Sequence, residues 1–237
     1  MFVVGKSGTL FDETVLRESR EYGHILQGDF PDTPHEDTRK FMLAADWLAR
    51  SADAGCPQRF VARTADNIYH NMVAISGWLY AKHHLAVAAR EEDLYTGLLL
   101  RGDRPIRNAA DPLFVPLDDY PKETFPDFVR SPVYVFAHRT LVSMSRAMAT
   151  VTPIAMEDAY VGLLAARVGV SPLNNDHFQM IVKTKDVCHW LRMFFVYGVR
   201  PSEQLAIFLQ IRKARKSRQC RNASWIDGRM VKNRIEV

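Results

Sequence analysis

The polar cluster Thr64–Asn67 follows the apolar run Phe60–Ala62, with Arg63 between them. This order is typical of a buried strand that delivers polar side chains to its carboxyl end, where α/β proteins usually bind ligands. Asp66 is the only carboxylate in the cluster. Because divalent cations such as Mg²⁺ and Mn²⁺ are held by several hard oxygen ligands, a single aspartate would bind such an ion weakly. The stretch therefore indicates a ligand-binding turn whose metal site is weak.

Two other motifs could be mistaken for functional sites. Gly5-Lys6-Ser7 resembles part of a phosphate-binding loop, but that loop needs another glycine five residues before its Gly-Lys pair. Gly5 lies too close to the start of the sequence for such a residue, so we expect a plain turn. His83 and His84 are neighbours on an expected helix and point in different directions, which favours surface residues over a metal site.

The apolar patterns predict alternating strands and helices. Strands are expected at residues 1–4, 24–27, 60–62, 97–102, 132–137 and 189–196, and helices at 38–49, 71–85, 138–149, 157–168 and 201–214. Residues 103–132, which are rich in proline and aspartate, are expected to form a loop or hairpin. The alternation is typical of an α/β fold with a mostly parallel sheet covered by helices on both faces. No repeat or low-complexity linker interrupts the chain, so we expect a single domain.

The net charge depends on one short segment. The chain has 237 residues and a net charge of +4, and 47% of its residues are hydrophobic, which is enough for a sizeable core. The segment Arg212–Arg221 carries six basic and no acidic residues, so the rest of the chain has a net charge of −2. Such a local patch is expected at a solvated helix end. It does not indicate a nucleic-acid-binding face, and no nucleic-acid partner is expected.

Three cysteines, Cys56, Cys188 and Cys220, allow at most one disulfide and leave at least one thiol. No pair has the spacing of a metal site, so the cysteines leave the redox compartment open. The sequence Asn222-Ala223-Ser224 would permit glycosylation in a secretory protein. No apolar run reaches the roughly eighteen residues that a membrane span needs, and the first residues show no signal-peptide pattern. As given, the chain is expected to have no means of entering the secretory pathway.

Several blocks, in order between residues 1 and 221, resemble the β-1,3-glycosyltransferases of family 31, the inverting galactosyl- and N-acetylglucosaminyltransferases of the Golgi. Residues 157–162, "EDAYVG", match the family's "EDVYVG" at every position but one. The stretch "RFVARTADNIYHN" is similar to its "KF--K-DDD-FVN" block, and "RPIRNAADPLFVPLDDYPKETFPDF" to the stretch that ends in "YP-YPPYCSG-GYV". Asp32 and Lys40 fall in register with a further block, "YGDIIQ-DF-D-Y-NLT-KT".

The resemblance implies a GT-A-like α/β fold for residues 1–221, with residues 222–237 as a C-terminal tail. Family members carry an upstream lumenal segment, with the first strand of the nucleotide-binding half, before the block that Met1 resembles. We expect that strand, the stem and the membrane anchor to be missing from this chain.

In the family, a divalent ion, usually Mn²⁺, is held by carboxylates of the Asp-rich turn and offsets the charge of the diphosphate leaving group. The three aspartates of that turn read Ala65, Asp66 and Asn67 here, and the histidine that helps complete the site corresponds to Tyr197. The resemblance thus implies a degenerate metal site made of Asp66 and the neutral amide of Asn67. Asp66 and Lys40 are also candidate contacts of the donor diphosphate, with a solvated turn residue and a helix-surface lysine as the alternatives.

The family's "CSG-G" turn reads Val129-Arg130-Ser131-Pro132-Val133 in this sequence. Side chains stand at both glycine positions, and glycines in such turns allow a close approach of the backbone. We therefore expect a crowded cleft or a displaced loop.

An inverting transfer needs one carboxylate that takes the proton of the acceptor hydroxyl as its oxygen attacks the anomeric carbon. The resemblance assigns this role to Asp158, with Glu157 in support. The structural alternative is that both residues cap the following helix, because carboxylates are favoured at helix N-termini. A position at the start of a helix agrees with both interpretations.

The resemblance implies a hexosyltransferase that moves a hexose from a UDP-sugar to a glycan acceptor on a glycoprotein or glycolipid, with inversion. Its location would be the lumenal side of the Golgi membrane, where family members are held by an N-terminal anchor absent from this chain. The alternative is a catalytically inactive member, a pseudoenzyme or fragment, that binds a glycan or another partner. The altered metal turn and glycine turn are the features that raise this alternative.

Overall fold

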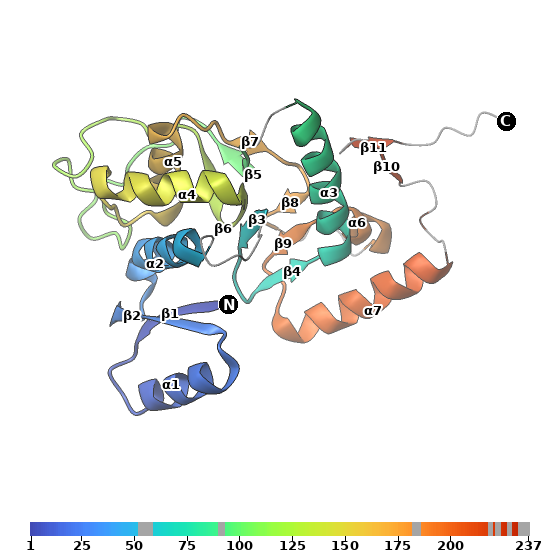
Figure 1. The fold of residues 1–237 in the computed structure, drawn as a ribbon, viewed down its shortest axis with the longest axis horizontal. Coiled ribbons are helices and arrows are strands. Elements are labelled where there is room, and N and C mark those ends of the chain that lie inside the picture. The colour runs from blue at the N-terminus through green and yellow to red at the C-terminus, as the bar shows by residue number, and fades with distance from the viewer. Residues whose placement is uncertain are drawn as a thin grey trace.

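The computed structural model describes residues 1–51, 59–89, 93–181, 186–217, 220, 224–226 and 229–231 of the chain. Its helices are α1 (Phe11–Tyr22), α2 (Asp37–Ser51), α3 (Met72–Ala89), α4 (His138–Ala147), α5 (Glu157–Arg167), α6 (Val187–Arg192) and α7 (Pro201–Ser217), shown in Figure 1. Short 3-10 helices lie at Pro34–Glu36 and Met148–Thr150.

The strands are β1 (Phe2–Lys6), β2 (Ile25–Pro31), β3 (Phe60–Arg63), β4 (Ile68–His70), β5 (Tyr95–Leu100), β6 (Phe128–Ala137), β7 (Leu173–Asn174), β8 (Phe178–Gln179), β9 (Phe195–Tyr197), β10 (Ser224–Ile226) and β11 (Arg229–Val231). They form a four-stranded sheet in the order β3-β6-β5-β7, a three-stranded sheet β4-β9-β8, and the pairs β1-β2 and β10-β11. The α/β class and the single domain agree with the sequence prediction.

The pairing of the strands is mixed, which corrects the expectation of a mostly parallel sheet. β1-β2, β5-β7 and β8-β9 are parallel, whereas β3-β6, β5-β6, β4-β9 and β10-β11 are antiparallel. The connection from β5 to β6, residues 101–127, contains no helix. Parallel neighbours need a crossover connection, usually helical, so a chain that returns through a loop pairs antiparallel with the strand it has just left.

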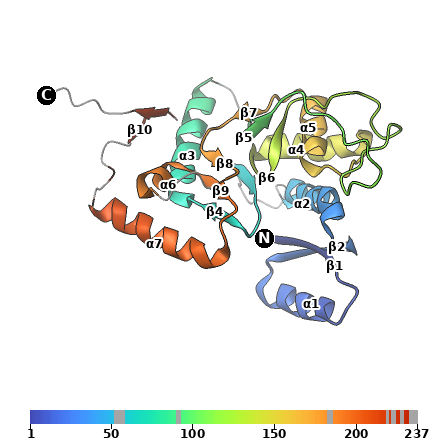
Figure 2. The same cartoon turned by 180° about the vertical axis from the view of Figure 1, so that it is seen from behind.

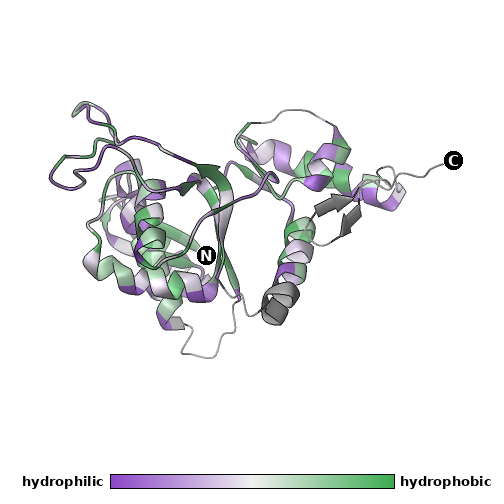
Figure 3. Ribbon diagram, turned by 90° about the horizontal axis from the view of Figure 1, so that it is seen from above, coloured by the Kyte–Doolittle hydropathy of each residue, from purple (hydrophilic) through white to green (hydrophobic). Residues whose placement is uncertain are grey.

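Helices cover both faces of the main sheet, because β6 is apolar on both sides. Tyr134 and Phe136 of β6 belong to a cluster with residues of α2, α4 and α5. Val133, Val135 and Ala137, at the alternate positions, belong to a second cluster with α3 and β9. Side chains alternate between the two faces of a strand, so this sequence buries both. Figures 1 and 2 show α2, α4 and α5 on one side of the sheet and α3 on the other, and the central strand is green, hence hydrophobic, in Figure 3.

The N-terminal part holds one helix that the sequence did not predict. α1 lies between β1 and β2, and none of its residues is buried. Asp12 in its first turn accepts hydrogen bonds from the backbone N–H groups of Ser7, at 2.8 Å, and Gly8, at 2.9 Å. Gly5 and Lys6 of the expected turn are the end of β1, and the turn follows at residues 7–9, where the protein's own carboxylate binds the N–H groups of Ser7 and Gly8.

The strand expected at residues 189–196 was wrong in its first half. Residues 187–192 form α6, and only Phe195–Tyr197 form the strand β9. Asp186 begins the helix, since its side chain accepts a hydrogen bond from the backbone N–H of Cys188 at 3.1 Å. A short apolar run does not by itself distinguish a strand from a buried helical turn. Here the Asp186 cap favours the helix.

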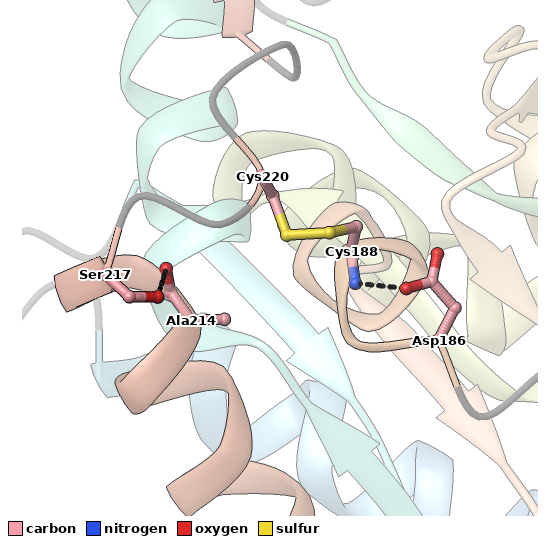
Figure 4. Close-up of a disulfide and its surroundings, with 5 residues drawn as sticks. All are labelled: Asp186, Cys188, Ala214, Ser217 and Cys220. Atoms are coloured by element: carbon pink, nitrogen blue, oxygen red, sulfur yellow. Dashed lines mark hydrogen bonds between the residues drawn. A yellow bond between two sulfur atoms is a disulfide. The ribbon is translucent and has the colours of Figure 1, made fainter.

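A disulfide fixes the C-terminal helices (Figure 4). Cys188 at the start of α6 is bonded to Cys220, which follows α7, with a Cα–Cα distance of 5.5 Å. α7 buries Ile211 against Trp190 of α6. The basic side chains Arg212, Lys213, Arg215 and Lys216 are exposed, in agreement with the prediction of a solvated helix end.

Some predictions concern parts that the structure leaves out. Cys56 and Asn222-Ala223 lie outside the described residues, and so do the side chains of His83 and His84. Across the described part of the chain, none of the helices combines the length and the hydropathy that crossing a membrane requires.

Candidate functional site

Asp158 lies at the start of α5 and is held by backbone groups. Its Oδ2 accepts a hydrogen bond from the N–H of Ser131 in β6 at 3.2 Å, and its Oδ1 accepts one from the N–H of Ala159 at 2.9 Å. Burial raises the pKa of Asp158, while these bonds and the nearby charge of Arg130 offset part of the rise. The N-cap residue itself is Met156, which makes no side-chain cap. Asp158 therefore binds one helix-start N–H and one N–H of a neighbouring strand.

Glu157, the first residue of α5, is buried beside Tyr134 and Arg63. Its Oε1 accepts a hydrogen bond from the hydroxyl of Tyr134, and its Oε2 lies 3.6 Å from Nη2 of Arg63. Burial raises the pKa of Glu157 to about 8; the charge of Arg63 lowers it, and the charges of Asp158 and Asp37 raise it. Glu157 therefore keeps its proton at neutral pH more readily than an ordinary glutamate, which suits a supporting residue better than a base.

Arg63 and Tyr134 are residues of the site that sequence reasoning missed. They face each other in the β3-β6 pair, and the guanidinium carbon of Arg63 lies 5.9 Å from the centroid of the Tyr134 ring. Arg63 also donates a hydrogen bond to the carbonyl of Pro132 at 2.8 Å. Two signals in the sequence could have found it: Arg63 is the charged last residue of an otherwise apolar strand, directly before the polar cluster, and it stands where the family block "KF--K-DDD-FVN" has its second lysine.

Lys40 is engaged by carboxylates of this chain. Its Nζ lies 2.7 Å from Oδ1 of Asp32 and 3.2 Å from Oδ1 of Asp37. Burial lowers the pKa of Lys40, but the hydrogen bonds with the two aspartates outweigh burial and raise it. Asp37 also lies 3.9 Å from Nη2 of Arg63, so a line of alternating charges connects Asp32 to Glu157. Lys40 is thus a partly buried ion-pair residue near the site.

The polar cluster Thr64–Asn67 is the turn between β3 and β4, as expected for a strand end. The carbonyl of Asp66 accepts a hydrogen bond from Gln204 of α7 at 2.7 Å, and the carbonyl of Asn67 accepts from the N–H groups of Gly198 and Val199, both at 3.0 Å. Asp66 is exposed, and Tyr197 pairs with Ile68 directly after the turn. The structure thus brings Tyr197 beside the turn, as the resemblance implied.

The groups around this turn do not fit a Mn²⁺ site. Ala65 packs against the second core cluster and offers no ligand. Within residues whose side chains the structure describes, no three histidine, cysteine, aspartate or glutamate side chains gather in a way that could hold a metal ion. One exposed carboxylate and one neutral amide are a poor donor set for a hard divalent cation.

His70 is a further polar residue beside the turn. Its Nε2 shares a short hydrogen bond with the hydroxyl of Thr64, and its ring meets Phe195 edge-on at 5.6 Å between centroids. Burial lowers the pKa of His70. This histidine therefore stabilises the turn as a neutral partner of Thr64.

The segment Val129–Val133 is part of β6, although residues up to 132 were expected to be a loop or hairpin. Val129 pairs with Leu99 of β5, and its N–H donates to the hydroxyl of Tyr95 at 3.0 Å. Non-glycine residues suit a strand, so the filled glycine positions extend β6 toward Asp158. The resulting backbone places Ser131 where its N–H binds the carboxylate.

The structure brings the two candidate halves of the site to one edge of the main sheet. The turn follows Arg63, which pairs with Tyr134, and Asp158 binds Ser131, three residues before Tyr134 in the same strand. Helices cover both faces of an α/β sheet, a polar turn follows one strand, and a carboxylate pair lies at the start of a neighbouring helix. This combination defines a glycosyltransferase-like architecture.

Comparison with known proteins agrees with this class. A sequence model of the galactosyltransferase family matches residues 1–176, which include the turn, β6 and all of α5 with its carboxylates. The chain belongs to the galactosyltransferase family, the family 31 enzymes that its motifs resemble.

Individual relatives cover nearly the whole chain. It is 29% identical to human UDP-GlcNAc:betaGal beta-1,3-N-acetylglucosaminyltransferase 8 over 90% of the chain and 52% of that protein. It is 25% identical to mouse beta-1,3-galactosyltransferase 1, over 88% of the chain and 62% of that protein. It is 26% identical to human beta-1,3-galactosyltransferase 2, over 94% of the chain and 53% of that protein. The chain thus spans between about half and three fifths of the length of these relatives.

Proposed function

We propose that this chain is the catalytic part of a hexosyltransferase that moves a hexose from a UDP-sugar to a glycan acceptor with inversion. The observation that carries the proposal is Asp158, a largely buried carboxylate oriented by the N–H groups of Ser131 and Ala159. The names of the relatives, β-1,3-galactosyl- and β-1,3-N-acetylglucosaminyltransferases, suggest galactose or N-acetylglucosamine as the hexose. The family resemblance implies a glycan on a glycoprotein or glycolipid as the acceptor.

Asp158 is suited to the role of general base. In an inverting transfer the acceptor oxygen attacks the anomeric carbon while its proton passes to a carboxylate and the diphosphate leaves on the opposite face. Burial raises the pKa of Asp158, which makes its ionised form a stronger base than a solvated aspartate. Two N–H bonds fix the direction of the carboxylate. Glu157 supports the start of the helix through the hydrogen bond that it accepts from Tyr134.

The donor is proposed to bind at the turn after β3. Asp66 is exposed there, and Lys40, which pairs with Asp32 and Asp37, is a neighbouring cation. Mn²⁺ would offset the charge of a leaving diphosphate in a family member with a full set of carboxylates. Ala65, Asn67 and Tyr197 do not supply such a set, so no step of this mechanism passes through a metal.

We place the protein in an oxidising compartment of the secretory pathway, on the lumenal side of the Golgi membrane. The Cys188–Cys220 disulfide supports this location, because disulfides persist in oxidising compartments and are rare in the cytosol.

The test is a transfer assay with a matched control. The chain is incubated with UDP-galactose or UDP-N-acetylglucosamine and a panel of β-galactosyl and N-acetylglucosaminyl acceptors, and UDP release and product linkage are measured. Transfer that depends on acceptor and disappears in Asp158→Asn supports the proposal. If the wild type and Asp158→Asn both bind glycan but neither releases UDP from any donor, the chain is a non-catalytic binding protein instead.

A further inference from the structure

Arg63 lies where three segments of the chain meet. It is the last residue of β3, directly before the proposed donor turn, and its side chain is about one quarter exposed, at 26%. Its Nη1 donates to the carbonyl of Pro132 in β6, at 2.8 Å. Its Nη2 faces the carboxylates of Glu157 in α5, at 3.6 Å, and Asp37 in α2, at 3.9 Å. One guanidinium therefore contacts β6, α5 and α2.

Two of these contacts lead to Asp158 by separate routes. The first passes through the backbone: Arg63 binds the carbonyl of Pro132, and the N–H of the preceding residue, Ser131, binds Oδ2 of Asp158. The second passes through Glu157, the residue before Asp158, whose carboxyl group lies between Arg63 and the hydroxyl of Tyr134. Both the hydrogen-bond partner of Asp158, Ser131, and its neighbour in the chain, Glu157, are thus connected to Arg63 at the end of β3.

We propose that Arg63 is a positioning residue that fixes the start of α5, and with it the carboxylate of Asp158, relative to the donor turn that follows β3. The inference rests on the proposed function for its catalytic meaning, but the structural coupling is independent of it. A base must lie within hydrogen-bond reach of the acceptor hydroxyl while the donor is bound, so the two halves of the site need a fixed distance.

An arginine suits this position because of its shape. Its planar fork presents several N–H groups in fixed directions, so it can bind a carbonyl and face two carboxylates at once. A lysine keeps the charge but is a single point donor, and it would bind either Pro132 or Glu157. Glutamine removes the charge as well. Arg63→Lys and Arg63→Gln therefore separate the geometry of the fork from its charge.

The test measures hydrogen exchange at single amides by NMR in the wild-type chain and in four variants. The amides to follow are those of Ser131 and Ala159, which donate to Asp158, with the amide of Asn175, bonded to the carbonyl of Gly97, as an internal reference. The variants are Arg63→Gln, Arg63→Lys, Glu157→Gln and a matched control, Arg101→Gln. Arg101 forms an exposed pair with Asp127 at 3.2 Å, away from these contacts.

Relative to Asn175, Arg63→Gln is expected to speed exchange at Ser131 and Ala159 on the order of tenfold, the effect of losing one or two hydrogen bonds. Arg63→Lys should give an intermediate increase. Glu157→Gln leaves the first route intact, so any change that it causes should be confined to Ala159 and spare Ser131. Arg101→Gln should leave all three amides unchanged. If Arg63→Lys matches the wild type, or if all amides speed up together, the positioning role is wrong.

A transfer assay on the same proteins keeps this inference distinct from the proposed function. If the wild type transfers sugar, Arg63→Gln should lower kcat at least tenfold, while the KM for the donor changes less than twofold, and Arg63→Lys should recover part of kcat. A loss confined to the donor KM would contradict the positioning role. If the wild type transfers nothing, the proposed function fails, and the exchange rates still decide whether Arg63 holds Asp158.

Discussion

The backbone N–H of Ser131 donates a hydrogen bond to Oδ2 of Asp158 at 3.2 Å, which joins the middle of β6 to the start of α5. Because a backbone group makes this bond, the direction of the carboxylate is set by the sheet and not by a mobile side chain. Ser131 occupies one of the positions where the family turn has a glycine. Because glycine carries the same N–H, the candidate base keeps a backbone partner whichever of the two residues stands at this position.

Asp158→Asn tests the assignment of the base. Asparagine keeps the shape and can still accept one of the two N–H bonds, but it cannot take a proton. We expect turnover to fall by roughly a hundredfold or more, the usual size of general-base assistance. Folding and donor affinity should stay near the wild type. UDP release and the melting temperature measure the two effects.

Asp158→Ala is the matched comparison, since it removes both the base and the acceptor of the two N–H bonds. Its free energy of unfolding should drop by on the order of 1 kcal/mol, as for the loss of a helix cap. If the asparagine variant is as active as the wild type and alanine merely lowers the melting temperature, Asp158 is a structural residue.

Donor binding by the wild type should depend little on Mn²⁺. Ala65, Asn67 and Tyr197 stand at three expected ligand positions, so we predict weak or no Mn²⁺-dependent binding of UDP. Calorimetric titration with UDP, in Mn²⁺ and in a chelator, checks this. Micromolar affinity that disappears on chelation would mean that other ligands complete the site.

Restoring the carboxylates of the turn should restore the binding of Mn²⁺. The triple variant Ala65→Asp, Asn67→Asp and Tyr197→His recreates the family donor set and should bind Mn²⁺ measurably tighter than the wild type. Neighbouring carboxylates repel each other without an ion, so the empty variant should be slightly less stable. A triple variant with no gain in affinity would indicate that the remodelled backbone at 129–133, or an absent segment, limits the site.

The elements that follow a clear apolar period were predictable from the sequence. The strands β1, β2, β3, β5 and β6 and the helices α2, α3, α4, α5 and α7 were expected within a few residues of their bounds. α1 was not, because half of its twelve residues are charged; its large apolar side chains, such as Leu16, remain exposed. The expectation of a mostly parallel sheet was wrong for β3-β6 and β5-β6, because the direction of β6 depends on how the chain returns from β5, which local patterns do not encode.

The candidate site was only partly predictable. A family motif located Asp158 and Glu157, and the end of an apolar run located Asp66. Arg63 was missed because its partners, Asp37, Pro132 and Glu157, are spread over 120 residues and meet only in the folded chain. The carboxylate partners of Lys40 lie within eight residues of it, yet their contact also required the structure.

The Cys188–Cys220 disulfide should stabilise the C-terminal helices. It closes a loop with a sequence separation of 32, and bridges of this kind typically contribute about 2–4 kcal/mol to the free energy of unfolding. Cys188→Ser should therefore lower the midpoint of urea unfolding, and a reductant should do the same to the wild type. Cys56→Ser, which leaves the bridge intact, is the control. Equal midpoints for Cys188→Ser and the wild type would show that the bridge does not constrain the unfolded chain.

Glu157 should make the stability of the protein depend on pH. Its pKa rises from 4.5 to about 8 on folding, chiefly through burial, so the folded chain holds a proton that the unfolded chain loses. Below pH 4.5 Glu157 is protonated in both states, and its contribution to stability is fully present. Between pH 4.5 and 8 the unfolded state ionises first, so that contribution is lost as the pH rises, by on the order of a few kcal/mol in total.

Glu157→Gln removes this titration and keeps the size of the side chain. We expect the difference in the free energy of unfolding between wild type and variant to fall steadily from pH 5 to 8, as measured by urea unfolding. Glu203→Gln is the control, because Glu203 forms an exposed pair with Arg200 at 3.0 Å and should leave the pH profile of the wild type unchanged. If the wild type instead gains stability with rising pH relative to Glu157→Gln, attraction to Arg63 outweighs burial. Glu157 would then be ionised in the folded protein, and Asp158 would not be the only carboxylate able to act as a base.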